Sequence, residues 1–324
     1  MSVAIVISQP GGPEVLKAIE ITLSEPGPDE VQIQHEVIGV NSVDIYYRSG
    51  LYPQSSSTTV PGFEGGGRVT AVGDNVRAFT PGDRVAYTGN PMGAYTELRN
   101  IPASRLIKIP EGVNIRAAGS SMLRGLTAHM LLHKVRKVKA GDWLLVHSAA
   151  GGLGQIVTRW ATMKGARVIG TTGSAAKMKI AQAAGAAEVL LHTDAAWAET
   201  VLKIADGRGV HLAIDGIGGT MLASTLSVVR PFGIVASLGQ PAGPIPPVRV
   251  EELGFARSIA LMRPSSIAYA DDAELYRQGA GDLMAALQNG LENPVGAEYT
   301  LTEAAKAHAD LEAGRTTGSV ILTV

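Results

Sequence analysis

The chain has 324 residues, of which 45% are hydrophobic and 18% charged, with a formal net charge of −1 and no cysteine. This length favours two domains, and this composition excludes a disordered chain because it can bury a large core. The balanced charge, without a basic stripe, argues against nucleic-acid and membrane-surface partners. The missing thiols exclude disulfides, cysteine nucleophiles and cysteine-ligated zinc.

The amino-terminal stretch "MSVAIVISQPGGPEV" has neither a basic start nor an apolar segment of signal-peptide length. Nowhere does the sequence approach the ~20 consecutive apolar residues that a membrane-spanning helix needs. The lack of disulfides fits a reducing compartment. We therefore expect a cytoplasmic protein without a membrane partner.

The first part of the chain, up to about residue 109, is β-rich. Short runs with β-branched residues are separated by Gly, Pro, Asn and Asp, and they predict strands at 30–40, 67–73, 83–89 and 94–101. Closely spaced short strands of this kind are typical of a compact barrel or sandwich.

The pattern changes near residue 116, where a helical stretch at 117–135 introduces alternating apolar and amphipathic runs. Strands are predicted at 143–147, 166–171, 187–192, 210–216, 233–239 and 258–264, and helices between them at 152–163, 174–184, 195–205 and 219–229. This alternation predicts an α/β fold with a doubly wound parallel sheet. Helices at 271–289 and 302–313 and a strand at 318–324 follow, and we interpret the proline-rich 241–253 as an ordinary loop rather than a cover over a ligand.

The turn "VHSAAGGLGQ" (146–155) connects the first of these strands to its helix. Gly151, Gly152, Leu153 and Gly154 follow the dinucleotide fingerprint, although Ala149 stands at its first glycine position. Small residues let the backbone approach a pyrophosphate, and the start of the helix offers N–H groups and the positive end of its dipole. The strand–turn–helix context favours coenzyme binding over a turn chosen only for packing.

The end of the second strand indicates which dinucleotide binds. Sites that prefer NAD carry an acidic residue about 20 positions after the glycines, but "TTGSAAKMK" (171–179) has none. It offers Gly173, Ser174 and Lys177 instead, and a 2′-phosphate suits a hydroxyl and a positive charge. We therefore predict NADPH as the coenzyme, with an ordinary surface lysine as the alternative.

Taken together, these segments resemble the quinone oxidoreductases, the zeta-crystallin-like branch of the medium-chain dehydrogenase/reductase superfamily. The matching stretches follow the family order over nearly the whole chain: "GGPEVL" (11–16), "IGVNSVDIYYRSGLYP" (38–53), "PGFEGGGRVTAVG" (61–73), "GDRVAY" (82–87), "GAYTEL" (93–98), "LRGLTAHMLL" (123–132), "HSAAGGLGQ" (147–155) and "GRTTGSVIL" (314–322).

The resemblance implies a Rossmann NADP-binding domain at 121–289, inserted into a GroES-like β-barrel domain formed by 1–120 and 290–324. It places the active site in the cleft between the domains. It also implies a homodimer or homotetramer that pairs through the edge of the Rossmann sheet.

Many relatives in this superfamily are zinc alcohol dehydrogenases, and here the sequence departs from them. They carry Cys where this chain has Asn41 and His where it has Phe63. The pair His129 and His133 has i, i+4 spacing but no third ligand nearby, so we interpret it as structural. We predict no metal.

Without a Lewis acid, conjugated acceptors such as quinones and enones become the easier substrates. They need alignment and hydrogen bonds to the developing oxyanion. The resemblance places Asn41, Tyr46, Tyr52 and, less directly, Asp44 around the substrate, with Arg124 as a further candidate donor where the family often has Lys. Helix capping by Asp44 and core packing by Tyr46 are the structural alternatives.

The resemblance also assigns further coenzyme contacts. His192 stands where relatives often have Tyr beside the adenine, and Leu238, Gly239 and Gln240 stand where they show Phe-Gly-Asn. Arg315 lies one position after a family arginine, so we assign it no phosphate contact.

Three functions compete on this basis. The first is an NADPH-dependent quinone reductase, and the second is an enone or enoyl (2-alkenal) reductase that saturates a C=C bond with the same hydride geometry. The third is a crystallin-like structural or RNA-binding protein, against which the net charge and the intact coenzyme turn both argue.

Overall fold

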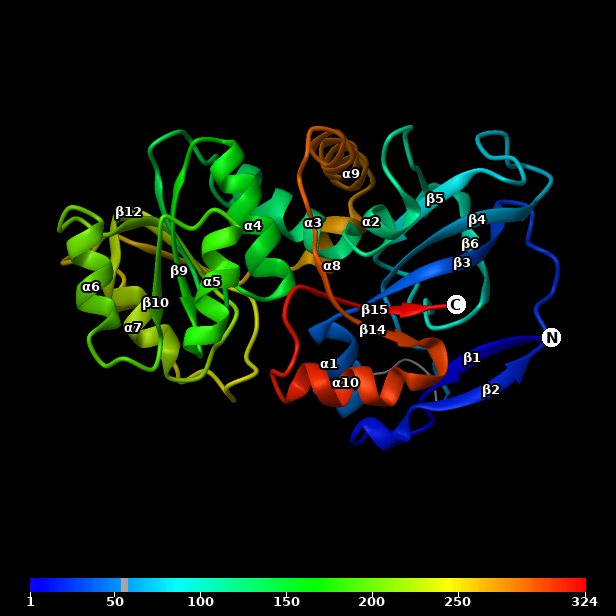
Figure 1. The fold of residues 1–324 in the computed structure, drawn as a ribbon, viewed down its shortest axis with the longest axis horizontal. Coiled ribbons are helices and arrows are strands. Elements are labelled where there is room, and N and C mark those ends of the chain that lie inside the picture. The colour runs from blue at the N-terminus through cyan, green and yellow to red at the C-terminus, as the bar shows by residue number, and fades with distance from the viewer. Residues whose placement is uncertain (54–57) are drawn as a thin grey trace. The chain divides into compact units, whose positions relative to one another are not determined.

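The structure, a computed structural model, describes residues 1–53 and 58–324. The described chain divides into two compact units (Figure 1). The first unit comprises residues 1–126 and 267–324, and the second comprises residues 127–266. Among the described residues, no helix is both long and apolar enough to span a bilayer.

The first unit contains a mainly antiparallel sheet with the strand order β14-β15-β3-β4-β5-β7, in which β6 pairs with β3 and only β14 and β15 run parallel within this described sheet. Its strands are β3 (Glu30–Val40), β4 (Glu64–Val72), β5 (Arg84–Thr88), β6 (Leu98–Pro102), β7 (Ile107–Lys108), β14 (Val295–Thr300) and β15 (Ser319–Thr323). A separate hairpin joins β1 (Ser2–Val6) and β2 (Lys17–Ile21). The β-rich texture predicted for this part of the chain is confirmed.

Alternation along β3 explains how this sheet builds its core. Val31 and Ile33 are fully buried, whereas Gln32 between them is half-buried. They share one cluster with apolar side chains from β5 and β15, namely Val85, Tyr87, Val320 and Leu322. Burying each such side chain stabilises the fold by roughly 1.5–3 kcal/mol.

The helices that lie wholly or mostly in the first unit are α1 (Ser42–Ser49), α2 (Ile115–Gly119), α3 (Met122–His129), α8 (Ser266–Asp271), α9 (Ala273–Gln288) and α10 (Ala304–Glu312). Helices α1 and α10 lie side by side (Figure 1). The predicted helix at 117–135 is present but is interrupted between α2 and α3, and it ends in a π-helical turn, η3 (Met130–Val135).

Helix α9 belongs to the first unit, although its residues fall inside the Rossmann domain that the sequence predicts. The Tyr276 hydroxyl donates to the Arg105 carbonyl at 2.6 Å. The Leu283 side chain also fills the space beside Gly125, 2.4 Å from where a Cβ would stand. These contacts, made by residues far apart in sequence, decide the division between the units.

The second unit contains a parallel sheet with the strand order β10-β9-β8-β11-β12-β13. Its strands are β8 (Trp143–Val146), β9 (Arg167–Thr172), β10 (Glu188–Leu191), β11 (Val210–Asp215), β12 (Val229–Ser237) and β13 (Ala260–Met262). The intervening helices are α4 (Gly152–Met163), α5 (Ala175–Ala183), α6 (Trp197–Ile204) and α7 (Met221–Ser227). The predicted doubly wound sheet is confirmed, and each predicted strand and helix of this region is present.

The continuous apolar run of β8 fits its place inside this sheet. All of its residues are buried, because β9 and β11 flank it and helices cover its faces. The chain order proceeds outward from β8 in one direction through β10 and in the other through β13. The strand order therefore reverses between β8 and β11, which is where open α/β sheets bind their ligands.

Candidate functional site

The glycine turn between β8 and α4 leaves no room for a larger residue at Gly154. A Cβ on Gly154 would lie 2.4 Å from the Ser148 carbonyl oxygen and 2.7 Å from the Ala149 Cα. Ser148 itself has a positive φ of 53°, and its carbonyl accepts a hydrogen bond from Gly151 at 2.9 Å. The turn is therefore as tight as the sequence predicts, with Gly154 packed against the backbone of Ser148 and Ala149.

Helix α4 begins at this turn without a side-chain cap. Its N-cap residue, Gly151, has no side chain to accept from the first-turn N–H groups. These groups lack intrahelical acceptors by geometry, and they carry the positive end of the helix dipole. An anionic phosphate is their natural partner.

The structure brings the predicted coenzyme residues of the second unit to one edge of its sheet. Each follows the carboxyl end of a parallel strand: β8, β9, β10 or β12. The residues at this edge are Gly151, Gly152, Leu153, Gly154, Gly173, Ser174, Lys177, His192, Leu238, Gly239 and Gln240.

The end of β9 carries the residues that the sequence assigns to the 2′-phosphate. Ser174 occupies the N-cap of α5, but its side chain makes no capping hydrogen bond. Lys177 lies in the first turn of that helix. Burial lowers the pKa of His192, and the positive charge of Lys177 lowers it further. Ser174, Lys177 and His192 therefore all lie near the end of β9.

Two further polar residues lie near the end of β12, and the sequence assigned neither of them a role of its own. The buried carboxylate of Asp215, at the end of β11, accepts from Ile217 N at 2.8 Å and from Gly218 N at 3.0 Å. Arg263 donates through Nη2 to the Gln240 side-chain oxygen at 3.0 Å. An acidic residue that ends an apolar strand just before glycines was the available signal for Asp215.

A cavity of about 450 Å³ lies against the same strands within the second unit. Its polar lining comes from Ser237, Gln240 and Arg263. The apolar lining includes the proline-rich segment, through Pro244, Ile245, Pro246 and Val248. That segment is a loop apart from one short turn, η4 (Val250–Glu252), as the sequence predicts.

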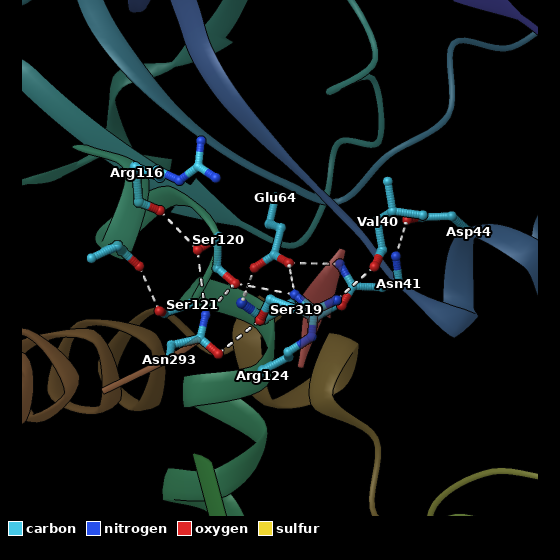
Figure 2. A network of polar contacts seen from close by, with 12 residues as sticks. Val40, Asn41, Asp44, Glu64, Arg116, Ser120, Ser121, Arg124, Asn293 and Ser319 are labelled. Atoms are coloured by element: carbon cyan, nitrogen blue, oxygen red, sulfur yellow. Dashed lines mark hydrogen bonds and ion pairs between the residues drawn. The ribbon is translucent and has the colours of Figure 1, made fainter. Parts of the chain in front are cut away.

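In the first unit, the start of α1 holds Asn41 and Asp44 in a buried setting. The Asn41 backbone N–H donates to the Asp44 carboxylate at 2.7 Å, so Asp44 does cap the helix. The Asn41 side-chain Nδ2 donates to Glu64 Oε1 at 2.7 Å (Figure 2). The side-chain amide of Asn41 has two N–H groups. This hydrogen bond uses one of them, so only the other is left for a substrate oxygen.

Glu64 is the centre of this network, and no feature of the sequence singled it out (Figure 2). Its carboxylate is fully buried and accepts from Arg124 Nη1 at 3.0 Å and from Leu123 N at 2.7 Å. Arg124 donates further to the carbonyls of Ser120, at 3.1 Å, and Val40, at 2.6 Å. Arg124 therefore joins β3, β4 and α3, which suits a positioning role better than that of a substrate donor.

Asp44 ends a chain of buried hydrogen bonds. Its Oδ2 accepts from the Tyr95 hydroxyl at 3.1 Å, and that hydroxyl lies 2.9 Å from His308 Nε2. The other His308 nitrogen faces Arg48 Nη1 at 3.3 Å. Burial raises the pKa of Asp44 to about 7, and burial also lowers the pKa of His308 to about 3.

Three tyrosines form an aromatic cluster at α1 and the segment after it. The ring of Tyr52 lies edge-on to Tyr46 and Tyr47, with centroids 5.4 Å and 5.6 Å away. Tyr47 also contacts Phe63, at 5.2 Å between centroids. Tyr46 and Tyr52 are half-buried, so each joins this cluster and still exposes part of its ring.

Within residues 1–53 and 58–324, no three His, Asp or Glu side chains lie close enough together to hold a metal ion. His129 and His133 do face the same way, with stacked rings 4.3 Å apart, and His133 Nε2 lies 3.1 Å from the Lys164 ammonium. Phe63, where zinc-dependent relatives have His, contributes a ring to the tyrosine cluster. Histidine nitrogen is a ligand that zinc accepts, but two histidines beside a lysine ammonium do not form the set of three or four ligands that a zinc site needs.

Two family models match the chain. The alcohol dehydrogenase GroES-like domain matches residues 27–111, and the zinc-binding dehydrogenase model matches residues 152–275. These matches confirm the predicted pairing of a GroES-like domain with a Rossmann domain.

The chain is similar over nearly its whole length to proteins with related names. A quinone oxidoreductase of Pseudomonas aeruginosa is 38% identical over 96% of both chains, and a 2-haloacrylate reductase of Burkholderia sp is 37% identical over 99% of both. The Escherichia coli quinone oxidoreductase complexed with NADPH has a TM-score of 0.95 at 34% identity and covers 99% of this chain and 100% of its own. The chain belongs to the quinone oxidoreductase family.

Proposed function

We propose that this chain is an NADPH-dependent quinone oxidoreductase that reduces its acceptor without a metal ion. The observation that carries the proposal is the edge of the second-unit sheet, where the tight turn at Gly154 precedes an uncapped helix and the end of β9 presents Ser174 and Lys177 in place of an acid. Similar proteins named quinone oxidoreductase, one of them complexed with NADPH, support the same activity.

The residues present fit this coenzyme. The N–H groups of residues 152–154 suit the pyrophosphate, because they open α4 and its N-cap, Gly151, has no side chain to accept from them. Ser174 and Lys177 suit a 2′-phosphate, for which an acidic residue would be repulsive. Leu238, Gly239 and Gln240 are assigned to the nicotinamide half, with Gln240 held by Arg263.

When bound, NADPH supplies a hydride, and a quinone that takes up a hydride and a proton becomes a hydroquinone. The protein must orient the acceptor and stabilise the negative charge that develops on its oxygen. We assign this task to Tyr46, Tyr52 and Asn41. Arg124 and Glu64 hold Asn41 in place, and Asp44 holds the start of α1.

An enone or enoyl reductase is the second candidate, and one comparison favours it. The 2-haloacrylate reductase named above is nearly as similar to this chain as the quinone oxidoreductases are. Saturating a C=C bond needs the same hydride donor and the same oxyanion contacts. The two activities differ in whether a proton is delivered to the carbon beside the carbonyl, which only saturation of the C=C bond requires.

Oxidation of NADPH by the purified protein separates the two candidates. The acceptors are 1,4-benzoquinone, 9,10-phenanthrenequinone and 2-hexenal, with a primary alcohol and NADP⁺ as a control for alcohol dehydrogenase activity. We expect turnover with the quinones and none with the alcohol. A saturated aldehyde formed from 2-hexenal as the preferred reaction would establish the second candidate, and tight NADPH binding without any turnover would contradict both.

The sequence also predicts an oligomer and a cytoplasmic location, and both stay proposals. An edge of the described second-unit sheet lies at β13, where Met262 is 46% exposed, and the nearby Phe255 is fully exposed. An apolar sheet edge of this kind suits pairing with a second copy. Light scattering of the purified protein tests the oligomer, and fractionation of cells that express it tests the location.

A further inference from the structure

The ring of His192 lies directly over the backbone at the end of β9. Its backbone N–H donates to the Thr172 carbonyl at 3.0 Å, which fixes the start of its loop beside that strand. A Cβ on Gly173 would stand 3.3 Å from both Cε1 and Nε2 of the ring. The imidazole therefore covers the glycine that precedes the N-cap of α5, on the Nε2 side of the ring.

One ring nitrogen of His192 is not used by the described protein residues. Its Nδ1 is buried and has no hydrogen-bond partner among them. A neutral imidazole with an unused nitrogen is a titratable group without an assigned structural role. Its position against Gly173, with the Lys177 charge acting on it, gives it a candidate ligand, since the end of β9 is where a 2′-phosphate is expected.

One charged side chain acts on this ring: Lys177, in the first turn of α5, brings a positive charge near it. His192 in turn lowers the pKa of His147, the residue just after β8. His147 bonds Thr171 and Thr225 through its two ring nitrogens, and burial holds its pKa at about 3, so it stays neutral. The nearby Asp194 carboxylate accepts from Ala196 N at the start of its own helix.

We propose that His192 binds the 2′-phosphate of the coenzyme adenosine and takes up a proton when it does so. In the free protein, burial and then the Lys177 charge lower the pKa of His192. A phosphate between the two side chains carries a charge of about −1.5 to −2 at neutral pH, which reverses the effect of Lys177 and favours the imidazolium. This inference rests on the proposed NADPH dependence and adds to it a residue that recognises the negative charge of the 2′-phosphate.

The proposal predicts a pH dependence with a definite sign. Because proton uptake accompanies binding, affinity for a 2′-phosphorylated ligand rises as the pH falls from 8.0 to 6.5, by up to tenfold per pH unit. Protonation of the phosphate itself, with a second pKa of about 6, would make binding release a proton instead. The direction of proton transfer therefore distinguishes the protein group from the ligand group.

Isothermal titration calorimetry of the full chain at pH 7.0, in two buffers of different ionisation enthalpy, measures this proton transfer. The probes are 2′,5′-ADP, which carries the 2′-phosphate, and 5′-AMP, which lacks it. We expect proton uptake with 2′,5′-ADP beyond that with 5′-AMP. In His192→Gln we expect the excess to disappear and affinity for 2′,5′-ADP at pH 6.5 to fall several-fold, with 5′-AMP affinity changed less than twofold.

A second variant, His192→Phe, keeps an aromatic ring for contact with the adenosine but removes the titration, and it should lose the excess as His192→Gln does. An equal proton transfer with both ligands in the natural protein would overturn the proposal, and so would an unchanged excess in either variant. Binding of 2′,5′-ADP without proton uptake would contradict this inference but not the NADPH assignment. No binding of 2′,5′-ADP at all fails the NADPH assignment as well.

Discussion

The two units build their candidate sites in opposite ways. In the second unit, the site is backbone and small residues at a sheet edge, with Gly154 against Ser148 and Ser174 exposed at a helix start. In the first unit, the site rests on charged side chains that are buried, with Glu64 fully covered and Arg124 only 7% exposed. The first kind of site depends on shape and the second on charge balance, so they should respond differently to substitution.

The largest effect should come from breaking the buried ion pair of the first unit. In Arg124→Met, the Glu64 carboxylate keeps its place but loses its cation, and an unpaired buried charge costs about 3–5 kcal/mol of unfolding free energy. The double variant Glu64→Gln, Arg124→Met should recover most of that loss. Urea unfolding of both variants measures it, and a loss under 1 kcal/mol in the single variant would show that the pair is not important for stability.

The next effect is the pH dependence that Asp44 gives to stability. Burial raises the pKa of its carboxyl to about 7, whereas the carboxyl of an unfolded chain titrates near 4. The folded state therefore holds a proton that the unfolded chain releases, and the stabilisation present below about pH 4 is lost as the pH rises through about 7.

Asp44→Asn removes this titration and should be more stable than the natural protein by on the order of a few kcal/mol at pH 8, with a much smaller difference at pH 4. Urea unfolding of both proteins across that range tests the sign, since other titrating groups cancel in the difference. A difference that does not change with pH would contradict the raised pKa.

In the second unit, the sharpest test of shape is Gly154→Ala. Its Cβ would meet backbone atoms rather than a flexible side chain, so the turn must shift, and the N–H groups assigned to the phosphate shift with it. We expect NADPH affinity to fall at least tenfold, which is about 1.4 kcal/mol.

Gly281→Ala is the matched control for this substitution. Gly281 lies within α9, and its Cβ would meet nothing within 4 Å. The same chemical change there should leave NADPH binding unaltered and stabilise the protein by roughly 0.5–1 kcal/mol. Equal NADPH affinity in the two variants would contradict the role of the turn.

A smaller effect separates the two coenzymes. Lys177→Gln removes a positive charge from the expected 2′-phosphate position, so NADPH affinity should fall about tenfold, while NADH affinity changes less than twofold. Lys179→Gln removes an exposed lysine from the same helix and should leave the preference for NADPH intact. Fluorescence titration with each reduced coenzyme measures both, and equal losses in the two variants would count against the specific role of Lys177.

The two candidate sites also differ in how much of them the sequence predicts. The coenzyme edge depends on local order, because a strand, a glycine turn and a helix lie together in sequence, and parallel strands bring their carboxyl ends to one edge. The absence of an acid at 171–179 is likewise a local signal. The side-chain details were not predictable, as the unused capping position of Ser174 shows.

The first-unit network combines residues that are far apart in sequence. Asn41, Glu64 and Arg124 meet only because β3, β4 and α3 pack together, and no periodic pattern in the sequence reports that contact. For Arg124, the sequence suggested a substrate donor, whereas the structure shows its N–H groups engaged by a carboxylate and two carbonyls. The same limit applies to α9, whose place in the first unit depends on Tyr276 and Leu283.

The central claim is that NADPH binds at the carboxyl edge of the second-unit sheet. A crystal structure of the protein grown with NADPH tests it most directly. The account predicts the pyrophosphate within hydrogen-bond distance of the N–H groups of residues 152–154, and the 2′-phosphate beside Ser174, Lys177 and His192. Coenzyme bound elsewhere, or a 2′-phosphate that points away from Lys177 into solvent, would contradict it.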